Sequence, residues 1–415
     1  MRVLWVKAGK LLPVDTGGRI RSYNMLRQLV TRHDVTLLSY YGGQRDKGYE
    51  SAIQEHFPET VTIWTGAPDT TLLERCIDYL RHVPARAPYA VTKFTSKEVQ
   101  RTLAASLSGR RHDVAICDFL APSLNFPAQT ATPTVLFQHN VESLLWQRQA
   151  RHETNYIKKL AFRFEAAKML RYERRTVQQF DHVIAVSDCD REQMKTMVDP
   201  ARISVVPTGV DWRHYSDAAG PSVTEPLVVF VGSMDWEANI DGVDYFCREI
   251  WPEVKASVPD ARLRIVGRDP HPRIARLASP SIEVTGSVAS VIPQMREAAV
   301  VIVPLRIGGG TRLKIYEAMA MKKAVVSTSI GAEGLDVEHG HDILLADTAA
   351  MFAAGVIGLL RDRYRRARME DLASKTVARY DWSVVTEEFE RVLIGVVGRS
   401  GNTRDIDMRA VPVGA

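Results

Sequence analysis

Short runs of β-branched residues alternate along this chain with longer helical patterns, and this alternation limits the possible folds. A strand, a helix and a second strand in succession build a parallel sheet joined by right-handed crossovers. In the first half, strand patterns occur at 2–7, 34–39, 61–64, 114–118, 134–138 and 182–186. In the second half, they occur at 227–231, 262–266, 282–284, 300–304 and 324–327. The pattern predicts an α/β protein with two parallel sheets.

The length of 415 residues exceeds what one hydrophobic core usually supports, so we expect two lobes of about 200 residues. We place the first domain at 1–206 and the second at 227–380. The stretch at 207–226 contains Pro, Gly and small polar residues, which are typical of a connector. Residues 401–415 are polar and lack apolar periodicity, and we predict a disordered tail there.

The sequence contains no membrane-spanning pattern, no signal-peptide pattern and no closely spaced cysteines. No apolar stretch approaches the roughly 20 residues needed to cross a bilayer, and the opening MRVLWVKAGK has a strand pattern without a signal-peptide core. Cys76, Cys117, Cys189 and Cys247 stand far apart without a C-x-x-C pair, which argues against structural zinc or a disulfide framework. We therefore expect a cytoplasmic protein.

Residues 300–334 predict a strand, a glycine loop, a helix and a second strand. Gly308, Gly309 and Gly310 follow the strand and allow the backbone to approach a ligand closely before a helix opens at Thr311. The N-terminus of a helix offers free N–H groups and a positive dipole end to a phosphate. The loop matches neither the G-x-x-x-x-G-K-[ST] pattern of nucleotide hydrolases nor the G-x-G-x-x-G pattern of dehydrogenases. The interpretation of the chain as either enzyme therefore loses its main support.

Two cations and a carboxylate follow this loop. Arg312 and Lys314 fall in the predicted first turn, where they oppose the helix dipole unless an anion binds there. Glu317 lies three residues after Lys314 on the same helical face, where its carboxylate can accept hydrogen bonds from a sugar diol. The ordinary alternative is a flexible glycine turn followed by an exposed ion pair.

Five segments, taken together, resemble the retaining GT-B-fold glycosyltransferases of family 4. The donor-site region of that family is resembled by PLRIGGGTRLKIYEAMAMKKAVVSTSIGAEGL. Its opening strand, glycine loop and first helix are resembled by RVLWVKAGKLLPVDTGGRIRSYNMLRQL. FQHN at 137–140 resembles the family's central histidine motif, and VVPTGVD at 205–211 resembles its connector. LVVFVGSMDW at 227–236 resembles the first strand of its second domain.

The resemblance implies a GT-B fold, with two Rossmann-like domains facing a central cleft and a last helix, 381–400, crossing back to the first domain. It implies transfer of a sugar from a nucleoside diphosphate, UDP or GDP, to an acceptor hydroxyl with retention at the anomeric carbon. A departing phosphate can take the acceptor's proton in such a reaction, so no nucleophilic carboxylate is required. No cofactor is expected beyond the nucleotide-sugar co-substrate.

Roles for individual residues follow from this resemblance. Arg312, Lys314 and the amides of Gly309, Gly310 and Thr311 would neutralise the leaving diphosphate, while Glu317 would hold the ribose. The amides of Gly17 and Gly18 could meet the diphosphate from the first domain, or the pair could be an ordinary loop. Amides at Gly232 and around Gly267 and Gly286 are candidates for the rest of the donor.

Strand ends of the first domain supply further candidates. His139 follows a strand directly, and a histidine at this place in the family contacts the donor sugar, although a lone histidine is more often structural. Asn140 and Glu142 would orient this loop or contact the acceptor, unless Glu142 is only a first-turn acid of a helix. Asp118 ends another strand and is either a site carboxylate or a helix cap.

The chain departs from the family in two places. Many members carry a second glutamate eight residues before the position of Glu317, where this chain has Gly309, so the usual carboxylate contact to the donor hexose is missing. The loop at 232–239 also lacks the Arg and Lys often found there, and we expect Arg312 and Lys314 to supply both charges.

Convincing metal-ligand spacing is absent near these residues. Asp-x-Asp occurs as Asp188 with Asp190, which also suits a helix cap, and as Asp405 with Asp407 in the tail. We predict that no metal is required.

Basic residues concentrate between Glu142 and Arg175, where nine Lys or Arg face four Glu. Apolar residues recur there at three- and four-residue intervals, which predicts one long amphipathic helix. These are Ile157, Leu160, Phe164, Ala167 and Leu170. Such a helix can rest on anionic lipid at the inner membrane face, which would fit a lipid-linked acceptor. The slightly favoured alternative is a helix whose apolar stripe packs on its own domain, with a soluble sugar or small molecule as acceptor.

Nucleic acid is not expected as a partner, because the basic charge is not interleaved with stacking aromatics. Two other functions remain open. A sugar-nucleotide epimerase of GT-B fold would need carboxylates at the hexose, and Gly309 counts against it. A non-catalytic glycosyltransferase-like subunit would be consistent with both departures from the family.

Overall fold

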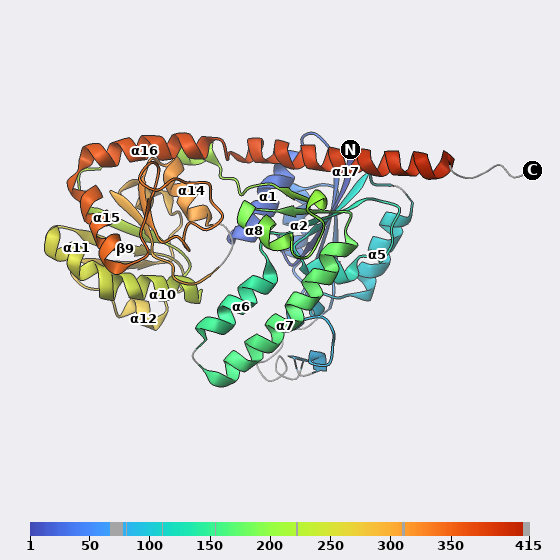
Figure 1. The fold of residues 1–415 in the computed structure, drawn as a ribbon, viewed down its shortest axis with the longest axis horizontal. Helices are drawn as coiled ribbons and strands as arrows, with labels where there is room; N and C mark the ends of the chain where they lie inside the picture. Colours follow the sequence, from blue (N-terminus) through green and yellow to red (C-terminus); the bar gives the residue numbers. More distant parts are fainter. Residues whose placement is uncertain are drawn as a thin grey trace, which may run out of the picture. The chain divides into compact units, whose positions relative to one another are not determined.

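A computed structural model describes residues 1–66, 78–79, 81–109, 111–153, 155–220, 223–308 and 312–409, with 400–409 described in their backbone only. The chain forms two compact units. Unit 1 comprises Met1–Val206 with Thr386–Ala415, and unit 2 comprises Pro207–Val385. Each unit holds a sheet covered by helices (Figure 1). Among the described residues, no helix is long and apolar enough to span a membrane.

Unit 1 contains a seven-stranded sheet in the order β3-β2-β1-β4-β5-β6-β7, and its neighbouring strands all pair in parallel. Its strands are β1 (Arg2–Ala8), β2 (Asp34–Tyr41), β3 (Thr60–Trp64), β4 (Val114–Asp118), β5 (Thr134–Phe137), β6 (His182–Ala185) and β7 (Ile203–Val205). The first six were predicted from sequence. The edge strand β7 was not, because three residues are too few to show a pattern.

The helices of unit 1 connect these strands. They are α1 (Gly17–Leu29), α2 (Lys47–His56), α4 (Tyr89–Thr92), α5 (Lys97–Ser108), α6 (Glu142–His152), α7 (Tyr156–Gln179) and α8 (Asp188–Met194), with short 3₁₀ turns at Ala121–Asn125 and Pro200–Arg202. Helix α17 (Trp382–Arg409) adds its portion from Thr386 onward. It is longer than the sequence indicated and includes 401–409, which we had assigned to a disordered tail.

The sheet of unit 1 is buried on both faces. Successive side chains of a strand point to opposite sides, so each strand contributes apolar residues to both faces. From β1, Leu4 and Val6 pack in one cluster with Val99 and Leu103 of α5. Trp5 points the other way, with its ring centroid 5.8 Å from that of Phe389 on α17. The apolar run of β1 therefore joins helices on both faces to one sheet.

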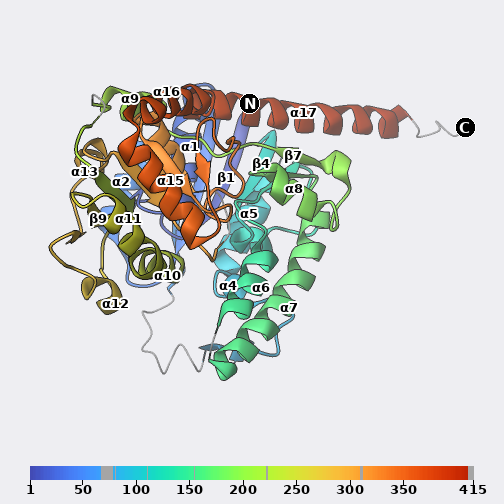
Figure 2. The same ribbon diagram turned by 60° about the vertical axis from the view of Figure 1, so that its left-hand side comes forward.

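The basic segment at 142–175 is two helices, so the prediction of one long helix is wrong. Helix α6 ends at His152, and Glu153 has extended backbone angles. Asn155 then caps α7, its side chain accepting hydrogen bonds from the N–H groups of Ile157 and Lys158. A capping asparagine favours the start of a new helix over continuation of the old one. The two helices lie side by side as a hairpin (Figures 1 and 2).

Unit 2 contains a six-stranded parallel sheet in the order β10-β9-β8-β11-β12-β13. Its strands are β8 (Leu227–Val231), β9 (Arg262–Val266), β10 (Ile282–Gly286), β11 (Val300–Val303), β12 (Ala324–Ser327) and β13 (Leu344–Leu345). Its helices are α9 (Trp212–Asp217), α10 (Glu237–Tyr245), the π-helical turn Phe246–Ile250, α11 (Trp251–Ser257), α12 (Pro272–Ala275), α13 (Ile292–Arg296), α14 (Leu313–Ala320), α15 (Ala349–Arg361) and α16 (Arg363–Ala378). The two-residue β13 was not predicted.

Both sheets reverse their strand order at one point, between β1 and β4 in unit 1 and between β8 and β11 in unit 2. The prediction of two Rossmann-like parallel-sheet domains is thus confirmed. In open α/β sheets, ligands bind beyond the carboxyl ends of the strands at such a switch point. Each unit therefore has one sheet edge where a site is expected.

Candidate active site

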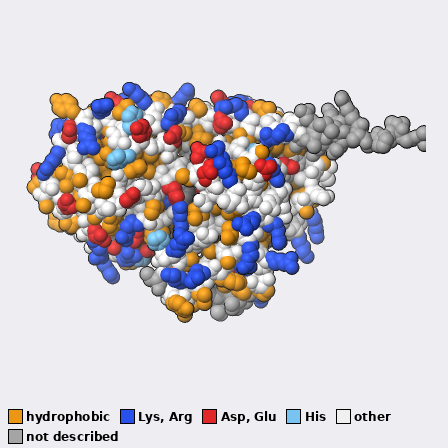
Figure 3. Space-filling view, viewed as in Figure 1, with side chains coloured by type: hydrophobic (Ala, Val, Ile, Leu, Met, Phe, Trp, Pro, Cys, Tyr) orange, Lys and Arg blue, Asp and Glu red, His pale blue; other side chains and the backbone are white. Residues whose placement is uncertain are grey.

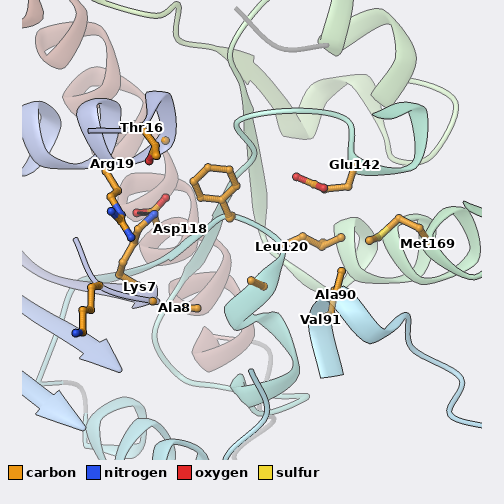
Figure 4. Close-up of a pocket in the computed structure, with 15 residues that line it drawn as sticks. Lys7, Ala8, Thr16, Arg19, Ala90, Val91, Asp118, Leu120, Glu142 and Met169 are labelled. Carbon is orange, nitrogen blue, oxygen red and sulfur yellow. Dashed lines mark ion pairs between the residues drawn. The ribbon is translucent and has the colours of Figure 1, made fainter. Parts of the chain in front are cut away.

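The switch point of unit 1 opens into a cavity of about 330 Å³. Lys7 and Asp118 line it from the ends of β1 and β4. Thr16 and Arg19, at the start of α1, lie on one side, and Glu142 of α6 and Met169 of α7 lie on the other (Figure 4). The cavity thus has a basic side chain, Arg19, on one side and the carboxylate of Glu142 on the other.

Lys7, Asp118 and His139 form a buried ionic cluster beside this cavity. Lys7 Nζ lies 3.1 Å from Asp118 Oδ2, and His139 Nε2 lies 2.9 Å from Asp118 Oδ1. The indole N–H of Trp5 donates to Asp118 Oδ2 at 3.0 Å, and Lys7 Nζ donates to Ser22 Oγ at 3.1 Å. Asp118 is therefore the counter-ion of Lys7 and a direct neighbour of His139, and it is not a helix cap.

Burial and charge act against each other in this cluster. Burial disfavours the Asp118 carboxylate, yet Lys7 and His139 outweigh it and hold the pKa of Asp118 below its usual range. Burial lowers the pKa of His139 to about 3, although Asp118 opposes this shift. His139 is consequently a neutral imidazole at physiological pH.

Phe119 covers His139. The two rings stack with centroids 3.7 Å apart, and only 2 % of the surface of His139 is exposed. A Cβ on Gly18 would lie 2.6 Å from the Phe119 ring, so a glycine is needed there for close approach. Phe119 has a φ of 72°, a left-handed conformation rare for a bulky residue. The cavity is lined by Gly18 and Phe119 and not by His139.

Glu142 reaches the cavity from the first turn of α6, and its backbone is held by α7. The carboxylate of Glu173 accepts hydrogen bonds from the N–H groups of Glu142 and Ser143 at 2.8 and 3.0 Å. Burial and the neighbouring Glu173 raise the pKa of Glu142 to about 7, while Asn140 opposes the shift. Asn140 thus adjoins Glu142. The exposed Gly17 opens α1 but does not line the cavity.

In unit 2, helix α14 begins at Leu313, so the predicted helix start at Thr311 is corrected. Arg312 has extended backbone angles and stands at the N-cap, while Lys314 occupies the first turn. The guanidinium of Arg312 is buried and lies 5.0 Å from the ring centroid of Trp236. Gly309, Gly310 and Thr311, which we predicted to bind the donor, lie outside the described residues.

Lys314 points to the loop that follows β8. Its Nζ donates to Asn239 Oδ1 at 3.1 Å and lies 4.4 Å from the ring centroid of Phe230. A Cβ on Gly232 would approach Lys314 Nζ to 2.6 Å, so a larger residue there would displace the ammonium. Gly267, after β9, packs against the Gly232 carbonyl so closely that a Cβ there would collide with it.

Glu317 lies one turn below Lys314 on α14. Burial raises the pKa of its carboxyl, while a hydrogen bond from Tyr215 of α9 and the charge of Lys314 oppose the shift. Burial lowers the pKa of Lys314 to about 7, with Arg312 acting in the same direction and Glu317 opposing it. Unit 2 therefore gathers Arg312, Lys314 and Glu317 at its switch point, next to Gly232.

Sequence reasoning missed four residues around these groups: Lys7, Phe119, Tyr215 and Asn239. A lysine at the end of an apolar strand, as in RVLWVK, is a signal that could have indicated Lys7. Tyr215 and Asn239 carry no local pattern, since tertiary packing alone brings them to α14. Among the described residues, no three His, Cys, Asp or Glu side chains gather as a metal site.

Two Rossmann-like units, each with polar groups collected at its switch point, define a GT-B glycosyltransferase architecture. Two family models match the chain, "Glycosyltransferase Family 4" over residues 16–213 and "Glycosyl transferases group 1" over residues 225–362. The chain belongs to this family of glycosyltransferases, as its sequence motifs predicted.

Proteins of similar sequence include a mannosyltransferase. An uncharacterised 44.6 kDa protein of the cps region of Klebsiella pneumoniae is 24% identical over 83% of this chain and 87% of its own length. The phosphatidyl-myo-inositol mannosyltransferase of Mycolicibacterium smegmatis is 32% identical, and the match spans 52% of this chain and 57% of that protein.

Solved structures share the fold, as two examples show. Anabaena HepE in complex with UDP has a TM-score of 0.65 at 15% identity, with 95% of this chain and 100% of that one covered. Sucrose-phosphate synthase from Thermosynechococcus elongatus has a TM-score of 0.69 at 14% identity, with 96% and 100% covered.

Proposed function

We propose that this protein transfers a sugar from a nucleoside diphosphate to an acceptor hydroxyl with retention of anomeric configuration, in polysaccharide or glycolipid assembly. The observation that carries the proposal is the grouping of Arg312, Lys314 and Glu317 at the switch point of unit 2. Two cations beside a helix N-terminus suit a diphosphate, and a carboxylate one turn below suits a ribose diol. The UDP bound by HepE supports a nucleotide donor of UDP or GDP type.

In this reaction Arg312 and Lys314 stabilise the negative charge that develops on the leaving diphosphate. Such preorganised charges act in a partly buried site, where they are worth several kcal/mol and need no reorganisation. Glu317, oriented by Tyr215, accepts hydrogen bonds from the ribose hydroxyls. Amides at Gly232, Gly267 and the 309–311 loop complete the donor site. We propose that no metal is needed, and that stereochemical retention follows the family.

The cavity of unit 1 is the proposed acceptor side. An anionic group of the acceptor would suit one side of the cavity, which carries the amide of Gly18 and the cations Lys10 and Arg19. The other side is apolar and is formed by Val91, Leu120 and Met169. Glu142 is placed to bind an acceptor hydroxyl. His139, which would contact the donor sugar by analogy with the family, is reached only after Phe119 moves.

The hairpin of α6 and α7 supports peripheral contact with an anionic membrane. In the predicted stripe, Ile157, Leu160 and Phe164 are 79, 60 and 46% exposed, and Ala167 is exposed too, whereas Leu170 packs against the core of unit 1. The expectation that the whole stripe packs on its own domain is therefore wrong. The neighbouring Tyr156 is 80% exposed. Figure 3 shows hydrophobic side chains with Lys and Arg beside them over this end of the hairpin. Apolar groups flanked by cations favour an anionic lipid surface by about 1 kcal/mol per basic residue. The same hairpin lines the acceptor cavity through Glu142 and Met169, and we propose a lipid-linked acceptor at the inner membrane face.

A transfer assay tests the proposed function. Purified protein is incubated with UDP-, GDP- and ADP-sugars and lipid-linked or soluble acceptors. Products are separated by chromatography and assigned by nuclear magnetic resonance, which distinguishes anomers and epimers of equal mass. Sugar transfer with retained configuration is expected. Epimerised sugar nucleotide without acceptor would indicate the epimerase, and nucleotide binding without any turnover would indicate a non-catalytic subunit.

A further inference from the structure

The loop at 232–239 lacks the arginine and lysine common in the family, yet it contacts both cations of α14. Trp236 lies under the Arg312 guanidinium, and Asn239 accepts a hydrogen bond from Lys314. We infer that Trp236 and Asn239 are positioning residues, which hold Arg312 and Lys314 toward the donor diphosphate through uncharged partners. The inference rests on the proposed function of those two cations.

Asn239 is itself fixed in place. It is 3% exposed, and its Nδ2 donates to the Ser233 carbonyl at 2.7 Å, which leaves Oδ1 directed at Lys314. A Cβ on Gly232 would lie 2.6 Å from Lys314 Nζ and 2.9 Å from Asn239 Nδ2, so the three residues lie close together. An amide in this position orients the ammonium without neutralising it.

Trp236 and Gly308 enclose the other cation. The Arg312 guanidinium faces the indole, and a Cβ on Gly308 would lie 3.5 Å from Trp236 Cη2 and would overlap Arg312 Nη2. Gly308 has a φ of 125°, which brings the loop backbone over the guanidinium. Stacking against an aromatic face fixes the plane of an arginine guanidinium and leaves its donors in that plane.

The loop at 232–239, α9 and α16 lie beside α14 and carry charged groups of their own. Among the described residues, no carboxylate lies within 4.0 Å of its Nζ, although Glu317 and Arg312 act at longer range. In the loop, Asp235 accepts from Ser233 and Glu237 pairs with Arg273. On α9, Asp211 caps its own helix, and on α16, Arg366 pairs with Glu370. The pKa of Lys314 is therefore lowered by burial first and by Arg312 second, while Glu317 opposes the shift.

Calorimetric titration of UDP, GDP and ADP at pH 7 and pH 9 tests the inference. Lys314→Arg is the reference, because the terminal phosphate titrates near the lower end of this range and the uracil and guanine bases titrate near the upper end. If the nucleotide binds only the charged form of Lys314, binding must be accompanied by protonation of this lysine. The affinity of wild type for the nucleotide that binds best should therefore fall about tenfold or more by pH 9. Lys314→Arg should bind without this dependence. Asn239→Asp, which keeps Lys314 charged through an internal ion pair, should reduce the pH effect to below about threefold, whereas Asn239→Leu should keep it.

Trp236 gives a second test with little risk to folding, since it is 41% exposed. Trp236→Ala should weaken nucleotide binding by roughly three- to tenfold and Trp236→Phe by less, the order expected for a cation–π contact. Tyr364→Ala, at a 91% exposed aromatic of the same unit, is the matched control. Suppose that wild type binds a nucleotide, that Asn239→Asp keeps the full pH effect and that Trp236→Ala keeps full affinity. These results would overturn the positioning roles and leave the donor site in place. No binding of any nucleotide by wild type would overturn the donor site itself.

Discussion

The ring of Phe119 stacks on the imidazole of His139 at 3.7 Å between centroids, and it separates this histidine from the cavity of unit 1. A residue with a φ of 72° stores roughly 1–3 kcal/mol of backbone strain, which its packing must offset. Strained residues of this kind cluster at sites that rearrange.

Removal of the Phe119 ring should open His139 to solvent. Diethyl pyrocarbonate acylates neutral imidazole, so Phe119→Ala should raise the modification rate at His139 by about tenfold or more, measured by peptide mass spectrometry. Phe126→Ala, which removes a different phenylalanine of unit 1, is the control. Equal protection of His139 in both variants would show that Phe119 is not its cover.

Loss of either cation of α14 should slow the chemical step. Arg312→Ala or Lys314→Ala should lower turnover by about 10²-fold or more, the scale for losing one preorganised charge. Release of nucleoside diphosphate during transfer gives the rate, and Arg248→Ala, an exposed arginine of unit 2, is the comparison. Activity abolished by a chelator but retained in Lys314→Ala would assign the task to a metal.

Acid should weaken unit 1 through His182. Burial, with Arg399 and Arg202 nearby, lowers the pKa of His182 to about 4 from the ordinary 6.5. A depressed pKa stabilises the folded state above 6.5, and this stability is lost as the pH falls through 4, at most roughly 3 kcal/mol. Hydrogen exchange of the β6 peptide should show protection falling from pH 6.5 to 4.5 in wild type and less in His182→Gln. Parallel curves would exclude His182 as the cause.

The hairpin should bind anionic vesicles reversibly. Changing Lys158, Lys159 and Arg163 to Gln should reduce cosedimentation at low salt, and about 0.5 M salt should release wild type, because screening shortens electrostatic reach. Lys168 is left unchanged since it is buried and donates to the carbonyls of His82 and Val83. The matched control replaces Arg365, Arg368 and Lys375 on α16. Equal amounts of all three proteins in the low-salt supernatant would remove the case for membrane contact.

Much of the architecture was predictable from residue patterns. Strands such as Val300–Val303 are buried on both faces and so appear as continuous β-branched runs, whereas β7 and β13 are too short to show one. The break between α6 and α7 was missed because no Pro or Gly separates the two helices in sequence, and only the capping role of Asn155 marks the new start.

The candidate site was predictable only in part. Loop and strand-end positions indicated Asp118, His139, Arg312, Lys314 and Glu317. Their partners come from tertiary packing: Lys7 pairs with Asp118 from another strand, and Asn239 meets Lys314 across 75 residues of sequence. Local propensity carries no information on such contacts, so neither partner was found.

The central claim is that unit 2 binds a nucleoside diphosphate through Glu317 and the two cations above it. Calorimetric titration of UDP, GDP and ADP into wild type, Glu317→Ala and the exposed control Glu253→Ala tests it most directly. At least one nucleotide should bind wild type and Glu253→Ala equally, and Glu317→Ala should bind it more weakly by roughly 1–3 kcal/mol, the range for losing hydrogen bonds to a charged group. Equal affinity in folded Glu317→Ala, or no binding of any nucleotide by wild type, would contradict the account.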